Sequence, residues 1–572
     1  MAIKHLGTEI SSDYDILKQK WLLDEISGDK MPDKPGICLF KNTAKAIKML
    51  NKHIQKPNSR IAMSTDVDMD GIGCTYILDR ELNALGVKTR IPIINKEKVH
   101  GIKEKYAHYF NQNPIDLLII TDSSSNDVDV IKMFNCDVLC IDHHELNHNE
   151  LQGKTNDGHD YLIVNNTIDN DSIEEDIEFL DNLNLEAFKN IDKTYKGDDR
   201  MSCGLVLYEL LRVLNIIYGQ DKLLENLMLY QWVGVTLFTD AIDLKTKRNQ
   251  WYVRNTVMSK YREKTLGDIM KVLNQFKYNT TTGIDKTYIG YTFAPVFNKA
   301  IRAGASAEAL QIVLRNPEKV LELKKYEVMQ KEAIDKAIYI FNESYEKGSE
   351  QYENSKVRKE FNEAYIMYDI TDDGTLPSYN GVIAGKMVNE FDKNSASFKR
   401  CENSDIVVGS FRGRLQGVDY RKHFLDEIGE NTNDIFAAGH KGAFGFRLHY
   451  DTLKKIMSTI NSIEPVTESK EYLTIGNVDK EKQGVYHIDN VMDFKRQGYL
   501  WRISIGNALV NSQDNIDLIV SSKDVVMKKA EEKVITYDVL GMECKAFQTL
   551  HGNLFRVYME YNKEIGFYIS NM

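Results

Sequence analysis

The chain has 572 residues, of which 42% are hydrophobic and 27% are charged. This length is too great for one hydrophobic core, so we expect two to four domains. The composition is typical of an ordinary soluble protein. The net charge of -11 argues against a protein that coats duplex nucleic acid, because its overall field repels phosphate.

Two other classes of protein are also disfavoured. No apolar run approaches the ~20 residues that a membrane-spanning helix needs, and residues 1–20 lack the apolar segment of a signal peptide. The seven cysteines form no CxxC pair and are odd in number, which argues against a disulfide framework or a zinc site. We therefore predict a cytoplasmic protein that does not contact a membrane.

An acidic motif follows the first predicted strand. Residues 61–63 are apolar, and Asp66, Asp68 and Asp70 then alternate before Gly71. Asp is unfavourable inside a strand, and three closely spaced carboxylates repel one another unless a cation lies among them. Hard cations such as Mg²⁺ or Mn²⁺ prefer these oxygen ligands. A solvated Asp-rich turn is the alternative interpretation.

Apolar strands alternate with helical patterns in the next hundred residues. Strands are predicted at 87–94, 115–121, 137–141 and 161–164, and helices at 72–85 and 127–134. Apolar strands separated by helices indicate a parallel sheet that is covered on both faces.

Ligands of such sheets bind at the carboxyl ends of the strands. Asp122 and the sequence Asp142-His143-His144 follow two of these strands, so we expect them to meet the acidic motif. Asp240 follows a further apolar segment, 227–238, whose pattern fits helix or strand. The sequence therefore predicts a metal site at one edge of the sheet.

The middle of the chain gives three weaker predictions. Residues 167–200 are acidic and predict a solvated helical insertion. Basic and aromatic residues are interleaved at 245–254. They are equally consistent with a surface that binds phosphates and stacks on bases and with an ordinary solvated helix face whose aromatic residues pack inward. A long helix is predicted from Asn316, as N-cap, to Gly348, with Pro317 at its first position. Its roughly 31 residues would span about 46 Å and join two domains.

The sequence of the last third of the chain predicts a second α/β unit followed by a β-rich unit. Strands at 365–370, 406–410 and 446–450 accompany a helix at 380–391 and a glycine-rich loop at 437–445. From about residue 465, short alternating strands predict a small all-β domain. An oligonucleotide-binding (OB) barrel is one such fold.

The ordered motifs resemble those of the DHH phosphoesterase superfamily, and within it the RecJ branch. Asp68-x-Asp70, Asp122, Asp142-His143-His144 and Asp240 stand in the order of the family's four metal-binding motifs. Three further segments resemble RecJ motifs: Pro295-x-x-Asn298-x-x-x-Arg302, Ser410-x-Arg412 and Gly439-His440-x-x-Ala443-x-Gly445. The resemblance covers roughly residues 35–455.

The resemblance implies a fold, a site and a substrate. It implies a parallel-sheet DHH domain (1–315), a connector helix (316–347) and a smaller α/β DHH-associated domain (348–462). The β-rich C-terminal domain (463–572) is predicted from the strand pattern alone. Two Mn²⁺ or Mg²⁺ ions would be held by Asp66, Asp68, Asp70, Asp122, His143 and Asp240. Asp122, His143, His144 and Asp70 would be catalytic, and Asn298, Arg302, Ser410, Arg412, Gly439 and His440 would bind phosphate.

The implied activity is 5′→3′ hydrolysis of single-stranded DNA to 5′ mononucleotides, in DNA repair, recombination or replication. A single-strand-binding protein or a helicase would be a candidate protein partner. Two alternatives stay open: a DHH phosphodiesterase acting on short oligonucleotides or cyclic dinucleotides, and a non-catalytic scaffold that binds single strands. The complete set of acidic and histidine motifs argues against the scaffold.

Overall fold

The computed structural model divides into two compact units, residues 30–327 and residues 1–29 with 328–572. The described residues are 34–94, 101–168, 173–183, 191–192, 201–240, 242, 246–258, 261–277, 289, 293–347, 359–361, 365–372, 374–391, 393–414, 418–429, 431–432, 434–462, 473–474, 516–522, 525–531, 534–539, 542–547, 549–551, 554–562 and 564–571. Among them, no helix is long and apolar enough to cross a membrane.

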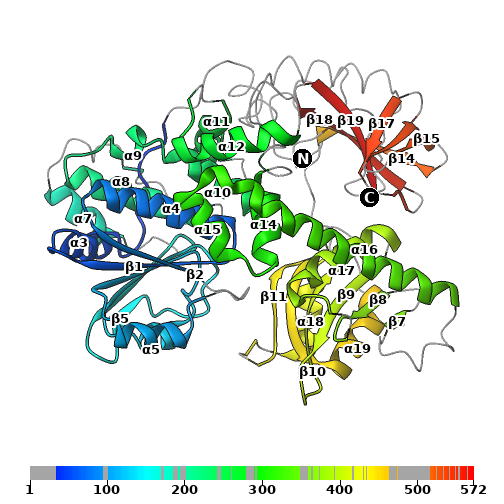
Figure 1. Cartoon of the computed structure of the whole chain (residues 1–572), viewed down its shortest axis with the longest axis horizontal. Coiled ribbons are helices and arrows are strands. Elements are labelled where there is room, and N and C mark those ends of the chain that lie inside the picture. The colour runs from blue at the N-terminus through cyan, green and yellow to red at the C-terminus, as the bar shows by residue number, and fades with distance from the viewer. Residues whose placement is uncertain are drawn as a thin grey trace. The chain divides into compact units, whose positions relative to one another are not determined.

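The first unit is built on a six-stranded sheet with the order β2-β1-β3-β4-β6-β5 (Figure 1). Its strands are β1 (Arg60–Thr65), β2 (Thr89–Ile94), β3 (Leu117–Thr121), β4 (Asp137–Asp142), β5 (Gln152–Lys154) and β6 (Asp160–Asn165). All pairs are parallel except β5 with β6. Thr65, Thr121 and Ile141 lie side by side, so β1, β3 and β4 end at one level. The predicted parallel sheet is confirmed.

Helices cover both faces of this sheet (Figure 1). On one face, α5 (Glu104–Gln112) and α6 (Val128–Ile131) bury Phe110 and Ile131 against Leu118 and Val138. The other face is contacted by α3 (Thr43–Ile54), α4 (Met69–Ala84) and α8 (Cys203–Ile217). Strands buried on both sides explain the continuous apolar runs of the sequence.

The ambiguous segment 227–238 is helical. It forms α10 (Tyr230–Thr239), which packs against α4, α8 and α11 (Lys247–Met258). In α11, Arg248 and Tyr252 are buried and bind the carboxylate of Glu209. These two residues therefore serve the core, and the phosphate-gripping interpretation of residues 245–254 does not hold for them.

The long helix differs from its prediction. Residues Pro317–Leu323 form a 3₁₀ helix, η3, and the α-helix α16 covers only Lys324–Lys347. The Asn316 side chain makes no capping bond, and 24 residues span about 36 Å. Val320 and Leu323 of η3 are fully buried, and η3 packs on α12 (Lys264–Lys277) and α15 (Ser306–Arg315). Tertiary packing thus overrides the α-helical pattern there. The division between the two units falls within α16.

Three shorter helices complete the described part of the first unit. They are α7 (Glu174–Asn182), α9 (Leu223–Asn226) and α14 (Ala294–Arg302). Helix α7 begins with three acidic residues and is the described part of the predicted acidic insertion.

The second unit contains a six-stranded mixed sheet with the order β11-β12-β10-β9-β8-β7. Its strands are β7 (Lys359–Phe361), β8 (Tyr365–Asp369), β9 (Asn394–Arg400), β10 (Ile406–Arg412), β11 (Phe436–His440) and β12 (Ala443–His449). Helices α17 (Asn380–Phe391), α18 (Tyr420–Ile428) and α19 (Tyr450–Thr459) pack on it. The predicted glycine-rich loop is wrong: residues 436–449 form a hairpin in which only Lys441 and Gly442 lie between the strands. Pairing of Ala437 with Phe446, both buried, draws these residues into the sheet.

The described residues of the C-terminal part form a seven-stranded sheet, in agreement with the predicted β-rich pattern. The order is β13-β14-β18-β19-β17-β16-β15. The strands are β13 (Leu473–Thr474), β14 (Ile516–Ser521), β15 (Val525–Ala530), β16 (Ile535–Val539), β17 (Met542–Ala546), β18 (Leu554–Asn562) and β19 (Glu564–Asn571). The strands predicted at 484–491 and 499–506 lie outside the described residues.

Candidate metal centre

The acidic and histidine motifs meet at the carboxyl edge of the first sheet. Asp66 and Asp68 lie between β1 and α4, and Asp70 lies in the first turn of α4. Asp122 follows β3, and His143 and His144 follow β4. Asp240 caps the C-terminal end of α10. Because β1, β3 and β4 are adjacent and parallel, their ends bring these residues together.

The side chains form three groups in which the possible ligand atoms lie within 4.8 Å of one another. The groups are Asp122 with His143 and His144, Asp70 with His143 and Asp240, and Asp66 with Asp68 and Asp122. The last two groups share no residue. The donor set therefore suits two hard divalent ions, which prefer oxygen ligands and accept imidazole.

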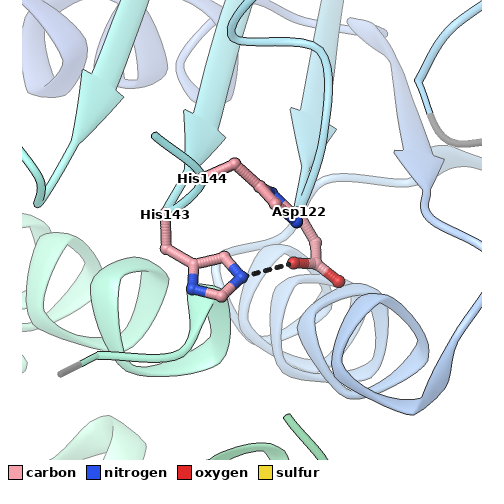
Figure 2. A group of neighbouring side chains, drawn as sticks. All are labelled: Asp122, His143 and His144. Atoms are coloured by element: carbon pink, nitrogen blue, oxygen red, sulfur yellow. Dashed lines mark ion pairs between the residues drawn. The ribbon is translucent and has the colours of Figure 1, made fainter. Parts of the chain in front are cut away.

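His143 presents one ring nitrogen to the carboxylates. Its Nδ1 lies 2.9 Å from the backbone oxygen of Met201, which can only accept a hydrogen bond, so Nδ1 carries the proton. Its Nε2 lies 3.2 Å from Oδ1 of Asp122 (Figure 2). The same nitrogen lies 3.5 Å from Oδ2 of Asp240. This orientation is the one that metal-binding histidines adopt.

Two buried polar atoms at the centre make no hydrogen bond to any described residue: Nε2 of His143 and Oδ2 of Asp122. A buried polar atom without a partner costs about 1–3 kcal/mol. A cation between them would satisfy both atoms, so this observation fits a metal site.

The raised pKa values of two buried carboxyl groups also fit a site for cations. Burial raises the pKa of Asp122 well above its usual value, and the charges of Asp70 and Asp68 raise it further. Burial also raises the pKa of Asp70, with Asp240 and Asp68 adding to the effect. Asp122 has a φ of 65°, a left-handed conformation that few residues except Gly, Asn and Asp adopt. Strain and unfavourable charge are thus concentrated on Asp122, which, like His143, belongs to two of the donor groups.

Asp142 does not belong to any of the three groups. Its Oδ1 accepts hydrogen bonds from the backbone N of His143 (2.8 Å) and from Nδ1 of His144 (2.7 Å). Its Oδ2 accepts from the backbone N (3.1 Å) and Oγ (2.6 Å) of Ser125. Asp142 therefore orients the two histidines.

The pair formed by Asp142 and His144 is charged. Burial alone would lower the pKa of His144, but the hydrogen bond and charge of Asp142 raise it to about 9. Burial alone would raise the pKa of Asp142, but the hydrogen bond and charge of His144 hold it well below its usual value. Near neutral pH, His144 is therefore an imidazolium at the mouth of the centre, half-exposed to solvent.

Comparison with known proteins identifies the family of this domain. Residues 60–161 match the DHH family, N-terminal domain. They form a DHH domain. A search of curated protein sequences gives no significant match.

Solved structures with the same fold extend the likeness beyond the DHH domain. RecJ from Thermus thermophilus in complex with Mn²⁺ has a TM-score of 0.64 at 13% identity, over 99% of this chain and 78% of that one. The same protein with Mg²⁺ gives 0.58 at 14% identity, over 99% and 77%. An exonuclease RecJ bound to manganese gives 0.52 at 17% identity, over 75% and 97%. The fold is therefore RecJ-like, and the donors of the DHH domain suit the divalent ions found in these structures.

The remaining predicted site residues belong to none of the three donor groups. Asn298 and Arg302 are one turn apart on α14, which contacts α4. Arg302 is half-buried, and burial lowers the pKa of its guanidinium.

The other predicted phosphate ligands belong to the second unit. Ser410 and Arg412 of β10 pair with Gly445 and Ala443 of β12, which in turn pair with Ala438 and His440 of β11. Alternate residues of a strand point to the same face, so Ser410 and Arg412 share one face. Gly439 is exposed on β11. A Cβ atom added to Gly381 of α17 would lie only 2.7 Å from Nη2 of Arg412, so α17 packs closely over this face.

The segment Met201–Gly204 also serves the metal centre, and the sequence analysis gave it no role. Met201 orients His143, as described above, and Ser202 caps α8 by accepting a bond from Leu205 N. The backbone N atoms of Cys203 and Gly204 donate to Asp70 at 2.9 and 3.1 Å. Backbone groups make most of these contacts, so residue type gives little signal for them. The sequence indicates only that a helix begins there, because Ser202 is a favourable N-cap and a helical pattern follows it.

Proposed function

We propose that this chain is a metal-dependent exonuclease that hydrolyses single-stranded DNA from the 5′ end to 5′ mononucleotides. The observation that carries the proposal is the pair of separate donor groups, Asp70 with His143 and Asp240, and Asp66 with Asp68 and Asp122. Two-metal sites of this type are common among enzymes that cleave phosphodiesters. The RecJ-like fold supports DNA as the substrate class.

The DHH domain would hold two ions through the six residues of these groups. When bound, divalent ions neutralise charge on a phosphodiester and make water a nucleophile near neutral pH. Asp122 and His143 each belong to two of the three donor groups, so both would contribute to holding the pair of ions. His143 keeps its proton on Nδ1, which donates to the backbone oxygen of Met201, and its Nε2 faces the carboxylates.

His144 would act on the substrate. Held by Asp142, its imidazolium can donate a hydrogen bond to a phosphate oxygen or to the leaving oxygen. Arg302 of the first unit and Arg412 of the second would bind phosphates along the strand, since a guanidinium offers a bidentate fork. Ser410, Gly439, His440 and Asn298 would add single hydrogen bonds.

We also propose that strands β14 to β19 form an OB barrel that binds single-stranded nucleic acid. Strands β14 and β15 stand near opposite ends of the sheet order, yet only three residues, 522–524, separate them in the chain. If β14 and β15 are two halves of one strand, that strand would pair with β18 and with β16, which would close the sheet. Phe547 is exposed and stacks on Tyr568 with ring centroids 5.7 Å apart. Such aromatic surfaces stack on bases.

The test of the proposed activity uses single-stranded DNA labelled at the 5′ or the 3′ end, with matched RNA and duplex controls. Release of 5′ mononucleotides from single strands with Mn²⁺, and none with chelator, is the expected result. Turnover of di- or trinucleotides without cleavage of long strands would instead identify a short-oligonucleotide phosphodiesterase. Binding without turnover would identify a scaffold.

A further inference from the structure

We propose that Cys203 is a positioning residue of the metal centre, whose thiol holds the ends of β3 and β4 in the arrangement that binds divalent ions. This inference rests on the proposed metal site of the DHH domain. It concerns a residue that touches no substrate and lies outside the three donor groups.

The thiol of Cys203 joins two strands to one helix. Its Sγ donates to the backbone oxygen of Ile141 at 3.2 Å and accepts from the backbone N of Asp122 at 3.1 Å. Ile141 is followed directly by Asp142, and Asp122 is the first residue after β3. Asp122 N also lies 3.0 Å from Ile141 O. The three atoms form a closed triangle, and the thiol fixes it to the start of α8.

This triangle supports a strained ligand. The positive φ of Asp122 costs of the order of 1–3 kcal/mol and persists only where its surroundings enforce it. The bond from Asp122 N to Sγ is such a constraint. Without the sulfur, the backbone N–H of Asp122 would lose one of its two hydrogen-bond acceptors. The carboxylate of Asp122 would then take a wider range of positions.

The backbone of Cys203 performs a second task that substitution leaves intact. Its N–H donates to Oδ2 of Asp70 at 2.9 Å, and any side chain at 203 keeps this bond. A second thiol, Cys74, lies 3.5 Å from Oδ1 of Asp70 and contacts Cys203. Changing only the side chain at 203 therefore separates the contribution of its thiol from that of its backbone N–H.

Nucleophilic or redox chemistry at Cys203 is disfavoured by its environment. The residue is fully buried, and burial raises the pKa of its thiol to about 11. Buried thiols with a raised pKa are unreactive. A positioning role is therefore the function that its contacts support.

The test measures Mn²⁺ affinity in metal-free protein, by calorimetry or by the electron paramagnetic resonance of free Mn²⁺. Cys203→Ala should bind Mn²⁺ about 10–100-fold more weakly, the range typical for residues that support metal ligands. Cys203→Ser keeps a donor and an acceptor and should recover most of the affinity. Cys136→Ala is the matched control, because Cys136 is equally buried in the core beneath α5 and α6.

The outcomes separate this inference from the proposed function. If the unaltered chain takes up no Mn²⁺, the metal site itself is wrong. If it binds Mn²⁺ and Cys203→Ala binds it equally well, Cys203 has no positioning role. An equal loss in Cys136→Ala and Cys203→Ala would also overturn the inference. Should Cys203→Ala fail to fold, Cys203→Val takes its place, because valine fills the space without hydrogen bonding.

Discussion

Replacing Asp142 by Asn removes one negative charge from the residue that orients His144. The carboxylate accepts hydrogen bonds from backbone N–H groups on both of its oxygens. An Asn amide must turn its NH₂ group towards one set of these donors. In either orientation a buried N–H loses its partner, which costs about 1–3 kcal/mol. We expect Asp142→Asn to fold with reduced stability.

The larger effect concerns the charge on His144. Asp142 holds the pKa of His144 at about 9, against an ordinary value of 6.5. A group whose folded pKa is raised is charged below that pKa and loses its charge as the pH rises through it. In Asp142→Asn the pKa of His144 would return to about 6.5. At pH 8 the charged fraction of His144 would then fall roughly 30-fold, from about 90% to about 3%. At pH 6 the change would be less than about twofold. Because His144 is half-exposed, solvent screening makes 30-fold an upper limit.

Two measurements check this prediction. Nuclear magnetic resonance titration of His144 in metal-free protein should show its pKa falling from about 9 towards 6.5 in Asp142→Asn, by about 2.5. The hydrolysis rate relative to the unaltered chain should fall more at pH 8 than at pH 6. Asp137→Asn is the control, because Asp137 begins the same strand and binds His53 at 2.8 Å. It should lower stability and leave His144 unchanged. An unchanged pKa of His144 in Asp142→Asn would refute the reasoning.

Three other substitutions test separate parts of the structure. Burial raises the pKa of Glu81 on α4 to about 7, so native stability falls as pH rises from 4.5 to 7. In denaturation experiments, the free energy of unfolding of Glu81→Gln should exceed that of the unaltered chain by up to ~3 kcal/mol at pH 8 and should equal it at pH 4. Equal free energies of unfolding at both pH values would contradict this. Arg412→Ala should weaken single-strand binding more than it slows turnover of bound DNA, and an effect on turnover alone would exclude the clamp. Phe547→Ala should weaken binding of long strands by about 1–3 kcal/mol and leave trinucleotide turnover unchanged; unaltered binding would exclude the stacking surface.

The sequence was sufficient for the parallel sheet because its central strands, β1, β3, β4 and β6, are buried on both faces. Runs such as residues 117–121 are apolar at nearly every position, and the Asp or His residues after them mark the strand ends. Parallel neighbours then bring Asp122 and His143 to one edge without further information.

Other features depend on contacts that sequence patterns do not encode. The buried Val320 and Leu323 follow a helical spacing, yet packing on α12 and α15 makes their segment a 3₁₀ helix. The glycines near 440 suggested a loop, whereas pairing with β12 makes a strand. Met201 serves the metal centre through its carbonyl oxygen, a group that every residue possesses. Backbone contributions of this kind become visible only in three dimensions.

The most direct test of the central claim is the number of Mn²⁺ ions that the metal-free chain binds. We expect two saturable sites, and at 100 times the dissociation constant each should stabilise the fold by about 2.7 kcal/mol. Asp122→Asn is the matched variant, since Asn tolerates the positive φ of this position. It should fold, lose Mn²⁺ binding and lose hydrolysis. Two sites in the native chain that disappear in Asp122→Asn would support the account. An absence of saturable Mn²⁺ binding, or full binding in Asp122→Asn, would contradict it.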